Sequence, residues 1–458
     1  MKNLKLTLAL NLVFSIFINA QEFNDASIKS KMGKINIPLP DKNAAVSDTI
    51  KKSPTIKKWT IMVFMNSKNN LENAGLYNIN QMESVGSNKD VNIVVEMGRM
   101  NGQKEGDSHL DGDWTGVRRF YIEKDTDSDH ISSQVVFSEA KYDMGDYKQV
   151  VNFVKWTKEN YPAKKYVLIL WDHGSGWLDP QQKKTASKGI SFDDETGNYI
   201  RTKQIGSILK EGGKVNILAF DACLMQMSEV VTEVKRYANV VVGSEETVPG
   251  YGYPYNLWLN YLSSHPEISD EDLGAVMVES FKKFYEYVKQ NAMLSAIRTS
   301  KIDGLNKLIS EFAELSMKVN DIEAMKKART EVLRFDILAN SDPKLEISFF
   351  GDLYNFADII SKNLTKEGDD VNSLKAKIEE LKNYISTNLV IDKGYYGNNK
   401  IGHSLADANG ISLYIPPVRA DIAQSRLESI FEEPYSTFDF DKDVKWHNFV
   451  DFIYKNVK

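Results

Sequence analysis

Two short apolar runs that each stop abruptly at a polar cluster constrain the fold of this 458-residue chain most strongly. The first covers residues 166–171 and is followed by His173; the second covers residues 215–220 and is followed by Cys223. Unbroken apolar runs of this length are typical of central strands in a parallel sheet that is covered on both faces. Open α/β sheets place their active sites at the carboxyl ends of such strands. The sequence therefore predicts an α/β fold with His173 and Cys223 at one edge of the sheet.

The remaining pattern divides the chain into two large parts. Strand-like and helix-like stretches alternate over residues 57–255, which favours right-handed crossovers and a mainly parallel sheet in a catalytic domain. Residues 256–458 read as a mostly helical region, with a capping-box-like helix start at Ser269 and Asp272. A late apolar stretch at 411–415 is expected to form a strand that joins or extends the sheet of the core.

The N-terminus has the features of an export signal. Lys2 and Lys5 precede an apolar run over residues 6–18 that is too short to span a bilayer, so we assign residues 1–20 to a signal peptide. The polar stretch 21–56 is interpreted as a flexible leader or pro-segment. No later run is apolar enough to cross a membrane, and the protein is expected to be secreted or periplasmic.

The net charge and the cysteine content of the chain limit the classes of function that it can have. The net charge is −6, without a basic stripe, which argues against nucleic-acid binding. The chain has one cysteine, Cys223, so an exported form has no internal disulfide. Its thiol is either a buried small hydrophobe or a reactive group, and the matched position of His173 favours the reactive group.

The remaining five histidines were weighed as alternatives to His173. His403 precedes an apolar strand and is the one serious rival. The other four are interpreted as exposed or as satisfied by core contacts: His109, His130, His265 and His447.

Cysteine and histidine together support nucleophilic catalysis. A thiol attacks a carbonyl as the thiolate, and a helix beginning at Cys223 would favour that anion through its dipole. His173 would stabilise the thiolate or protonate the departing amine. The backbone amides of Gly174 and Cys223 are the candidate donors to the oxyanion. No paired-cysteine or H-x-x-x-H spacing predicts a metal site.

Six blocks in a fixed order carry a family resemblance. Together they resemble the clostripain family (peptidase C11), within the clan CD cysteine peptidases. The likeness extends from about residue 59 nearly to the end of the chain. It implies a caspase-like, mainly parallel sheet with helices on both faces, plus a mostly helical C-terminal region. The blocks lie at residues 59–66, 69–72, 172–177, 221–223, 244–250 and 409–416.

The resemblance also implies an activity. Members are cysteine endopeptidases with a Cys-His dyad, here Cys223 and His173, and they cleave protein or peptide substrates after Arg or Lys. An aspartate two residues before the nucleophile helps to bind that basic side chain, and Asp221 matches it. A carboxylate holds a guanidinium through two parallel hydrogen bonds.

One position departs from the family pattern. Relatives often carry a second acid after the Pro-Gly pair, where this chain has Tyr251. The tyrosine either narrows the pocket or supplies a hydroxyl, which leaves the choice between Arg and Lys open. Glu245 and Glu246 either add charge to the pocket or serve only as loop residues.

Family members are made as zymogens that cut themselves between the histidine and the cysteine. Our hypothesis is cleavage after Lys184 or Lys188, giving light and heavy chains that stay associated; the alternative is an uncut, solvated lysine run. The resemblance implies no required cofactor, although some members depend on calcium. Acidic residues at 193–195 offer oxygen ligands.

Two other functions were considered. A transpeptidase uses the same acyl-thioester chemistry, with an amine in place of water. A catalytically inactive binding or adhesion module of the same fold needs neither His173 nor Cys223, and the presence of both residues argues against it.

Overall fold

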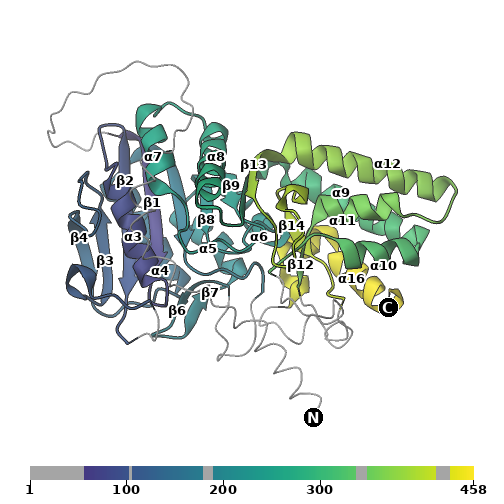
Figure 1. The fold of residues 1–458 in the computed structure, drawn as a ribbon, viewed down its shortest axis with the longest axis horizontal. Coiled ribbons are helices and arrows are strands. Elements are labelled where there is room, and N and C mark those ends of the chain that lie inside the picture. Colours follow the sequence, from purple (N-terminus) through teal and green to yellow (C-terminus); the bar gives the residue numbers. More distant parts are fainter. Residues whose placement is uncertain (1–55, 103–105, 179–188, 337–347, 419–433, 458) are drawn as a thin grey trace, which may run out of the picture.

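The computed structural model describes residues 56–102, 106–178, 189–336, 348–418 and 434–457, and places a large sheet beside a group of helices (Figure 1). The predicted signal peptide and nearly all of the predicted leader lie outside the described residues. Lys184 and Lys188 lie outside them as well.

A nine-stranded sheet of order β13-β10-β9-β8-β5-β1-β2-β3-β4 organises the described chain. The five central strands β9, β8, β5, β1 and β2 pair in parallel, and two antiparallel strands extend the sheet on each side. The prediction of a mainly parallel α/β sheet is confirmed. The strands are β1 (Lys57–Asn66), β2 (Val91–Arg99), β3 (Gly116–Tyr121), β4 (Gln134–Glu139), β5 (Ala163–Trp171), β8 (Val215–Asp221), β9 (Ala238–Gly243), β10 (Ala292–Arg298) and β13 (Val390–Tyr396).

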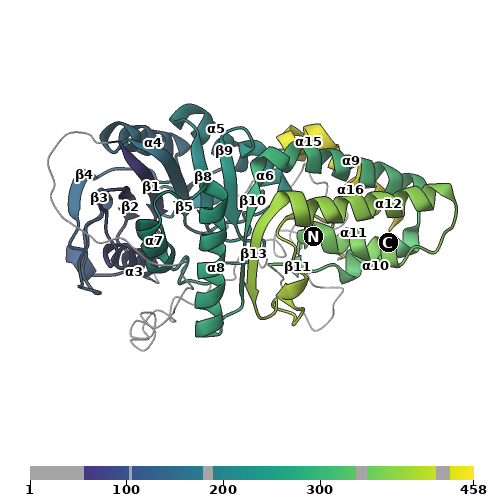
Figure 2. The ribbon, with the colours of Figure 1, turned by 90° about the horizontal axis from the view of Figure 1, so that it is seen from above.

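Both faces of the central strands of the sheet are buried. Ile61 and Val63 of β1 belong to one apolar cluster, and Met62 and Phe64 belong to the other, as the alternation of side chains along a strand requires. Helices cover the two faces from opposite sides (Figure 2). The first face carries α3 (Glu72–Glu83), α7 (Tyr255–Ser264) and α8 (Asp270–Val288); the second carries α4 (Tyr147–Asn160), α5 (Thr202–Gly212) and α6 (Ser228–Val234).

Local sequence signals set where two of these helices begin. The side chain of Ser269 accepts a hydrogen bond from the backbone N–H of Asp272, so the predicted helix start is confirmed. Asp146 caps α4 by accepting from the backbone N–H of Lys148. Such caps satisfy amide groups that have no partner within the helix.

The C-terminal region is mostly helical, as predicted, and lies beside the β13 edge of the sheet in both views (Figures 1 and 2). It also shares the large sheet, because β10 and β13 come from residues beyond 255. Its helices are α9 (Ile302–Val319), α10 (Ile322–Glu331), α11 (Leu353–Lys362), α12 (Asp369–Tyr384), α15 (Asp439–Val444) and α16 (Trp446–Asn456).

The predicted late strand requires a correction. β14 (Ser412–Tyr414) forms within the stretch 411–415, but it belongs to a separate three-stranded sheet with β11 (Arg334–Phe335) and β12 (Phe350–Asp352). The guanidinium of Arg334 donates to the carbonyl groups of Ser348 and Ile415, which holds β14 against β12. A lone bridge from Ser412 to Met227 connects it to the chain that follows β8, and the strand that extends the large sheet is β13.

No helix in the described ranges combines the length and the apolar character needed to cross a membrane.

Trp177 ties the segment after β5 to the C-terminal region. Its fully buried ring packs edge-on against Tyr414, Tyr435 and Phe438, with ring centroids 5.3, 4.8 and 5.9 Å away. Aromatic pairs in this geometry stabilise beyond the area that they bury. Packing of the C-terminal region against Trp177 therefore helps to fix the chain at the end of β5.

Replacing Trp177 by alanine is expected to lower the free energy of unfolding by about 3–5 kcal/mol, because the change empties a large buried site. Urea denaturation in a Cys223→Ala background, which excludes self-cleavage, measures the difference. Tyr287→Ala is the control, since that ring is 39% exposed and its loss should cost only about 0.5 kcal/mol. Equal effects of the two changes would contradict the proposed support.

Candidate active site

The register between β5 and β8 places the two predicted catalytic residues. The last aligned pair of these parallel strands is Trp171 with Asp221, and the backbone N–H of Asp172 donates to the carbonyl oxygen of Asp221 at 3.2 Å. His173 and Cys223 each follow two positions beyond that pair. Residues far apart in the sequence thus leave the sheet at the same level, at the carboxyl ends of neighbouring strands.

Gly174 lets the two strand ends approach each other closely. A Cβ atom at this position would overlap the carbonyl oxygen of Cys223 and lie 3.2 Å from the Cys223 nitrogen. Only glycine accommodates that contact without moving the backbone. The structure therefore places Gly174 against the backbone of Cys223, with His173 next to Gly174 in the chain.

Cys223 does not begin a helix, and that expectation was wrong. The chain turns sharply after the thiol, with Leu224 in the left-handed region at φ 65°, and α6 starts only at Ser228. The N–H of Leu224 donates to the carbonyl oxygen of Glu246 at 3.2 Å, which fixes this turn. A residue with positive φ ends the regular backbone, so the thiol receives no stabilisation from a helix N-terminus.

The surroundings of Cys223 keep its thiol protonated. The backbone N–H of Val248 donates to Sγ at 3.3 Å, which favours the thiolate. Burial outweighs this bond and raises the pKa of Cys223 to about 12, and the charges of Asp336 and Glu246 raise it further, against a lowering by Lys400. In this state Cys223 carries a neutral thiol.

His173 is also neutral, and its tautomer is set by Asn70. Burial lowers the pKa of the imidazole to about 4. Nε2 lies 2.7 Å from Oδ1 of Asn70, an acceptor, so Nε2 carries the proton and Nδ1 keeps a free electron pair. His173 and Cys223 do not hydrogen bond to each other among the described contacts, and such bonds commonly tighten only with substrate.

Asn70 is a residue whose role the sequence analysis did not identify. It stood in one of the blocks that carry the family resemblance, without an assigned function. Its signal was its position in the turn that follows β1, four residues after the end of the strand, because β1 pairs with β5 and ends at the same edge of the sheet. The neighbouring Asn69 donates to Oδ1 of Asp172 at 2.7 Å, which holds the chain beside His173.

Asp221 lies under the loop that follows β9. Its Oδ2 accepts hydrogen bonds from the N–H of Tyr253 and the hydroxyl of Tyr255, both at 3.0 Å. Burial raises the pKa of this carboxyl group to about 7. The backbone at Gly252 lies close to the Asp221 carboxyl group, since a Cβ atom there would lie 2.8 Å from Oδ2. The acid is therefore two residues before Cys223 in the chain, and one of its oxygens is hydrogen bonded to the loop.

The other two predicted substrate-binding residues have partners of their own. Glu245 is fully buried, and its Oε2 accepts from the N–H of Gly410 at 2.8 Å. The buried ring of Tyr251 packs between Tyr77 and Phe284, with centroids 6.0 and 5.8 Å away. The structure does not bring the Glu245 carboxylate to the thiol, whereas the charge of its neighbour Glu246 acts on the thiol.

Asp193, one of the acidic residues that offer oxygen ligands to calcium, is engaged with the protein itself. Asp193 accepts backbone hydrogen bonds from Met144, Glu195 and Thr196, and its Oδ2 lies 3.6 Å from Nζ of Lys68. The described residues hold no group of three acidic, histidine or cysteine side chains suited to a metal ion. Because its oxygens are taken by amides and an ammonium group, Asp193 does not fit a calcium site.

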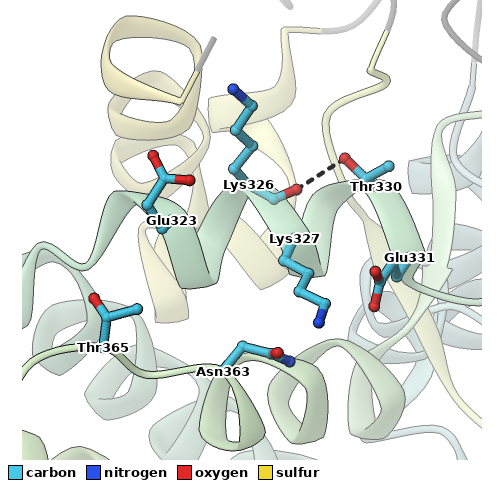
Figure 3. A pocket seen from close by; sticks show the side chains of 7 residues that line it. All are labelled: Glu323, Lys326, Lys327, Thr330, Glu331, Asn363 and Thr365. Carbon is cyan, nitrogen blue, oxygen red and sulfur yellow. Dashed lines mark hydrogen bonds between the residues drawn. The ribbon is translucent and has the colours of Figure 1, made fainter.

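A pocket of about 420 Å³ lies elsewhere, between α10 and the chain that follows α11 (Figure 3). None of the predicted site residues lines it. His403, the rival histidine, is exposed in a loop. The pocket is lined by Glu323, Lys326, Lys327, Thr330, Glu331, Asn363 and Thr365.

Comparison with known proteins identifies the family to which the chain belongs. The model of the clostripain family, Peptidase_C11, matches residues 63–452, which is most of the chain. The chain belongs to the clostripain family. It is therefore a cysteine peptidase, and peptides are its substrates.

Individual relatives agree with this assignment. Clostripain from Hathewaya histolytica is 24% identical over 445 residues, covering 87% of this chain and 80% of that protein. A secreted C11 cysteine protease from Bacteroides thetaiotaomicron, in complex with an irreversible peptide inhibitor, is 18% identical with a TM-score of 0.58, over 86% of this chain and 99% of that chain. An inactive zymogen C11 protease from Parabacteroides distasonis is 17% identical with a TM-score of 0.60, over the same shares. This clostripain-family chain shares their fold.

In this clostripain-family peptidase, Asn70→Ala is expected to lower kcat roughly 10- to 100-fold with little change in KM, because the imidazole loses its orientation. Asn70→Asp keeps an acceptor oxygen and should retain much of the activity. Steady-state kinetics on a peptide substrate measures both variants. Asn260→Ala, an exposed site on α7, is the control. A kcat for Asn70→Ala within twofold of the parent would contradict the positioning role.

Proposed function

We propose that this clostripain-family peptidase is an exported endopeptidase that cleaves after Arg or Lys through a dyad of Cys223 and His173. The register of β5 and β8 carries the proposal, because it sets a thiol and an imidazole at neighbouring strand ends. Gly174 adds a backbone N–H that can approach the same point closely.

The neutral states of the two side chains define the order of proton transfer. As Sγ attacks the scissile carbonyl carbon, Nδ1 of His173 takes the thiol proton, while Nε2–H stays bonded to Asn70. The amides of Gly174 and Cys223 stabilise the oxyanion. The imidazolium then protonates the leaving amine, and an acyl-enzyme remains until water, activated by His173, releases the acid product.

Base-assisted attack suits the raised pKa of Cys223. A thiolate formed in advance is rare when the thiol pKa is about 12. A base that removes the proton during the attack avoids that cost, and the Val248 N–H supports the sulfur as negative charge develops.

Asp221 is the proposed partner for the basic P1 side chain. Its Oδ2 is held by Tyr253 and Tyr255, whereas Oδ1 accepts no hydrogen bond from the described residues. A guanidinium or ammonium group reaching Oδ1 would favour the ionised carboxylate, which burial otherwise disfavours.

Export and self-processing complete the proposal. The first 20 residues have the composition of a signal peptide. The processing segment departs after Leu178 and returns at Gly189, and the N–H of Gly189 donates to the Leu178 carbonyl oxygen at 3.2 Å. Because these two ends are held side by side, a cut between them leaves β5 and β8 paired in one sheet, and the light and heavy chains stay associated.

Intact-mass measurement of the active enzyme tests self-processing. We expect two fragments whose boundary follows Lys184 or Lys188, and a single uncut chain from Cys223→Ala produced in the same way. Active enzyme consisting of one uncut chain would remove this part of the proposal.

Hydrolysis of fluorogenic peptides that differ only at P1 tests specificity. We expect the parent enzyme to cleave Arg and Lys peptides in preference to Ala and Asp peptides, and Cys223→Ala to cleave none. Asp221→Asn should lose roughly 10- to 100-fold in kcat/KM for the basic peptides, the cost of a charged hydrogen bond. Asp451→Asn, an exposed acid on α16, is the matched control.

Activity that survives Cys223→Ala would refute the mechanism. An unchanged P1 preference in Asp221→Asn would refute the role of Asp221. Transfer of the acyl group to an added amine in place of water would identify a transpeptidase, and the absence of any Cys223-dependent cleavage would favour an inactive binding module.

A further inference from the structure

Two carboxyl groups beside the nucleophile take no part in the mechanism above. Glu246 belongs to the loop after β9, and its carbonyl oxygen accepts from the N–H of Leu224, the residue after Cys223. Two residues further on, the Val248 N–H contacts Sγ at 3.3 Å. Glu246 is therefore fixed against the nucleophile through its own backbone and that of Val248.

The side chain of Glu246 is joined to a second acid. Its Oε1 accepts from the N–H of Asp336 at 3.1 Å and from the N–H of Thr247 at 2.8 Å. Glu246 is 4% exposed, and its Oε2 is buried without a hydrogen-bond partner among the described residues. A buried carboxylate oxygen without a partner is costly, and a cation is its natural ligand.

An ammonium group of the chain already sits at this acid pair. Nζ of Lys400 lies 3.3 Å from Oδ1 of Asp336, and the Lys400 side chain is 33% exposed. Lys400 belongs to a turn that is anchored through Asn399, whose amide donates to the carbonyl of Arg334. Asp336 thus already binds an ammonium group, while Oε2 of Glu246 has no hydrogen-bond partner among the described residues.

The acid pair and Asp221 are held by different parts of the chain. Asp221 is held by Tyr253 and Tyr255, in the loop that leads into α7. Asp336 follows β11 of the small sheet, in the C-terminal region. One cationic side chain bound to Asp221 would therefore leave Glu246 and Asp336 available to a second one.

The charge around the thiol gives the pair a consequence for catalysis. Glu246 and Asp336 bring two acids and Lys400 brings one cation, and the acids oppose negative charge on sulfur. If these two carboxyl groups only stabilised the structure, their negative charge would hinder the attack of Sγ on the substrate. A cation delivered by the substrate would offset this effect at the moment of reaction.

We propose that Glu246 and Asp336 form a second cation subsite, which binds an ammonium or guanidinium side chain of the substrate at a position other than P1. The preferred substrates are then peptides with two basic residues near the scissile bond. Lys400 occupies part of the subsite in the free enzyme and competes with that second side chain. This inference rests on the proposed cleavage after Arg or Lys.

The test is a peptide series with Arg fixed at P1, in which each position from P4 to P2′ carries either lysine or its uncharged counterpart norleucine. The readout is the ratio of kcat/KM for lysine over norleucine at each position. We expect one position to show a ratio of roughly tenfold in the parent enzyme. Glu246→Gln and Asp336→Asn should bring that ratio close to one, and Lys400→Met should raise it.

Matched controls separate binding from folding. Glu314→Gln on α9 and Lys375→Met on α12 change exposed residues and should leave the ratio at the parent value. Thermal melting checks each variant, and the glutamine and asparagine keep the size and one oxygen of the acids that they replace. Because the readout is a ratio within one protein, partial loss of folded enzyme does not affect it.

The possible failures are distinguishable. Cleavage after Arg by the parent, with ratios near one at every other position, overturns the second subsite and leaves the proposed function intact. A strong ratio that survives in both Glu246→Gln and Asp336→Asn also overturns it. Absence of any Cys223-dependent cleavage after Arg refutes the proposed function, and the subsite with it.

Discussion

The parallel pairing of β5 with β8 is the constraint on which the rest of this site depends. These strands are central, buried on both faces, and their aligned ends set His173 and Cys223 at the same level. A slip of one residue in either strand would turn every side chain to the opposite face of the sheet. Because the side chains on both faces of these strands are buried, that slip is excluded. The close approach of Gly174 to the Cys223 backbone then brings the two strand ends together. The same hydrophobic burial that stabilises the fold thus fixes the geometry of the chemistry.

Burial also determines the protonation states of the thiol and the imidazole at the site. It favours the uncharged forms of Cys223 and His173, raising the pKa of the thiol and lowering that of the imidazole. In the proposed mechanism the proton therefore stays on sulfur until a substrate arrives, and Asn70 keeps the imidazole in the tautomer that accepts it. In the proposed function, Asp221 and the acid pair of Glu246 and Asp336 make cationic substrates the complement of this site. Recognition and activation are coupled in that proposal, because a bound cation relieves charge that opposes the attack.

The sequence predicted the features that follow from burial and periodicity. Two unbroken apolar runs indicated β5 and β8, and their polar ends indicated His173 and Cys223; the helix start at Ser269 followed from local capping chemistry. It did not predict features that depend on how loops fold back. The left-handed residue Leu224 delays α6 and removes the expected helix N-terminus from the thiol.

Orientation was equally hidden from the sequence. Glu245 and Glu246 are neighbours of the same type, yet the first faces Gly410 in the interior and the second is joined to Asp336 near the nucleophile. The partner of Asn70 depended on the pairing of β1 with β5, which no local pattern reports. Likewise, β14 had the composition of a core strand, but its pairing with β12 was decided by the C-terminal region.

Labelling with an arginyl peptide chloromethyl ketone tests most directly whether His173 and Cys223 act as one unit. Intact mass and peptide mapping follow the adduct in the parent enzyme and in His173→Ala, with a small neutral alkylating agent as the reference reaction. We expect one adduct per chain, on Cys223, formed roughly 100-fold more slowly without the imidazole, while the reference reaction changes little. An adduct on another residue, or equal labelling rates in the two proteins, would contradict it.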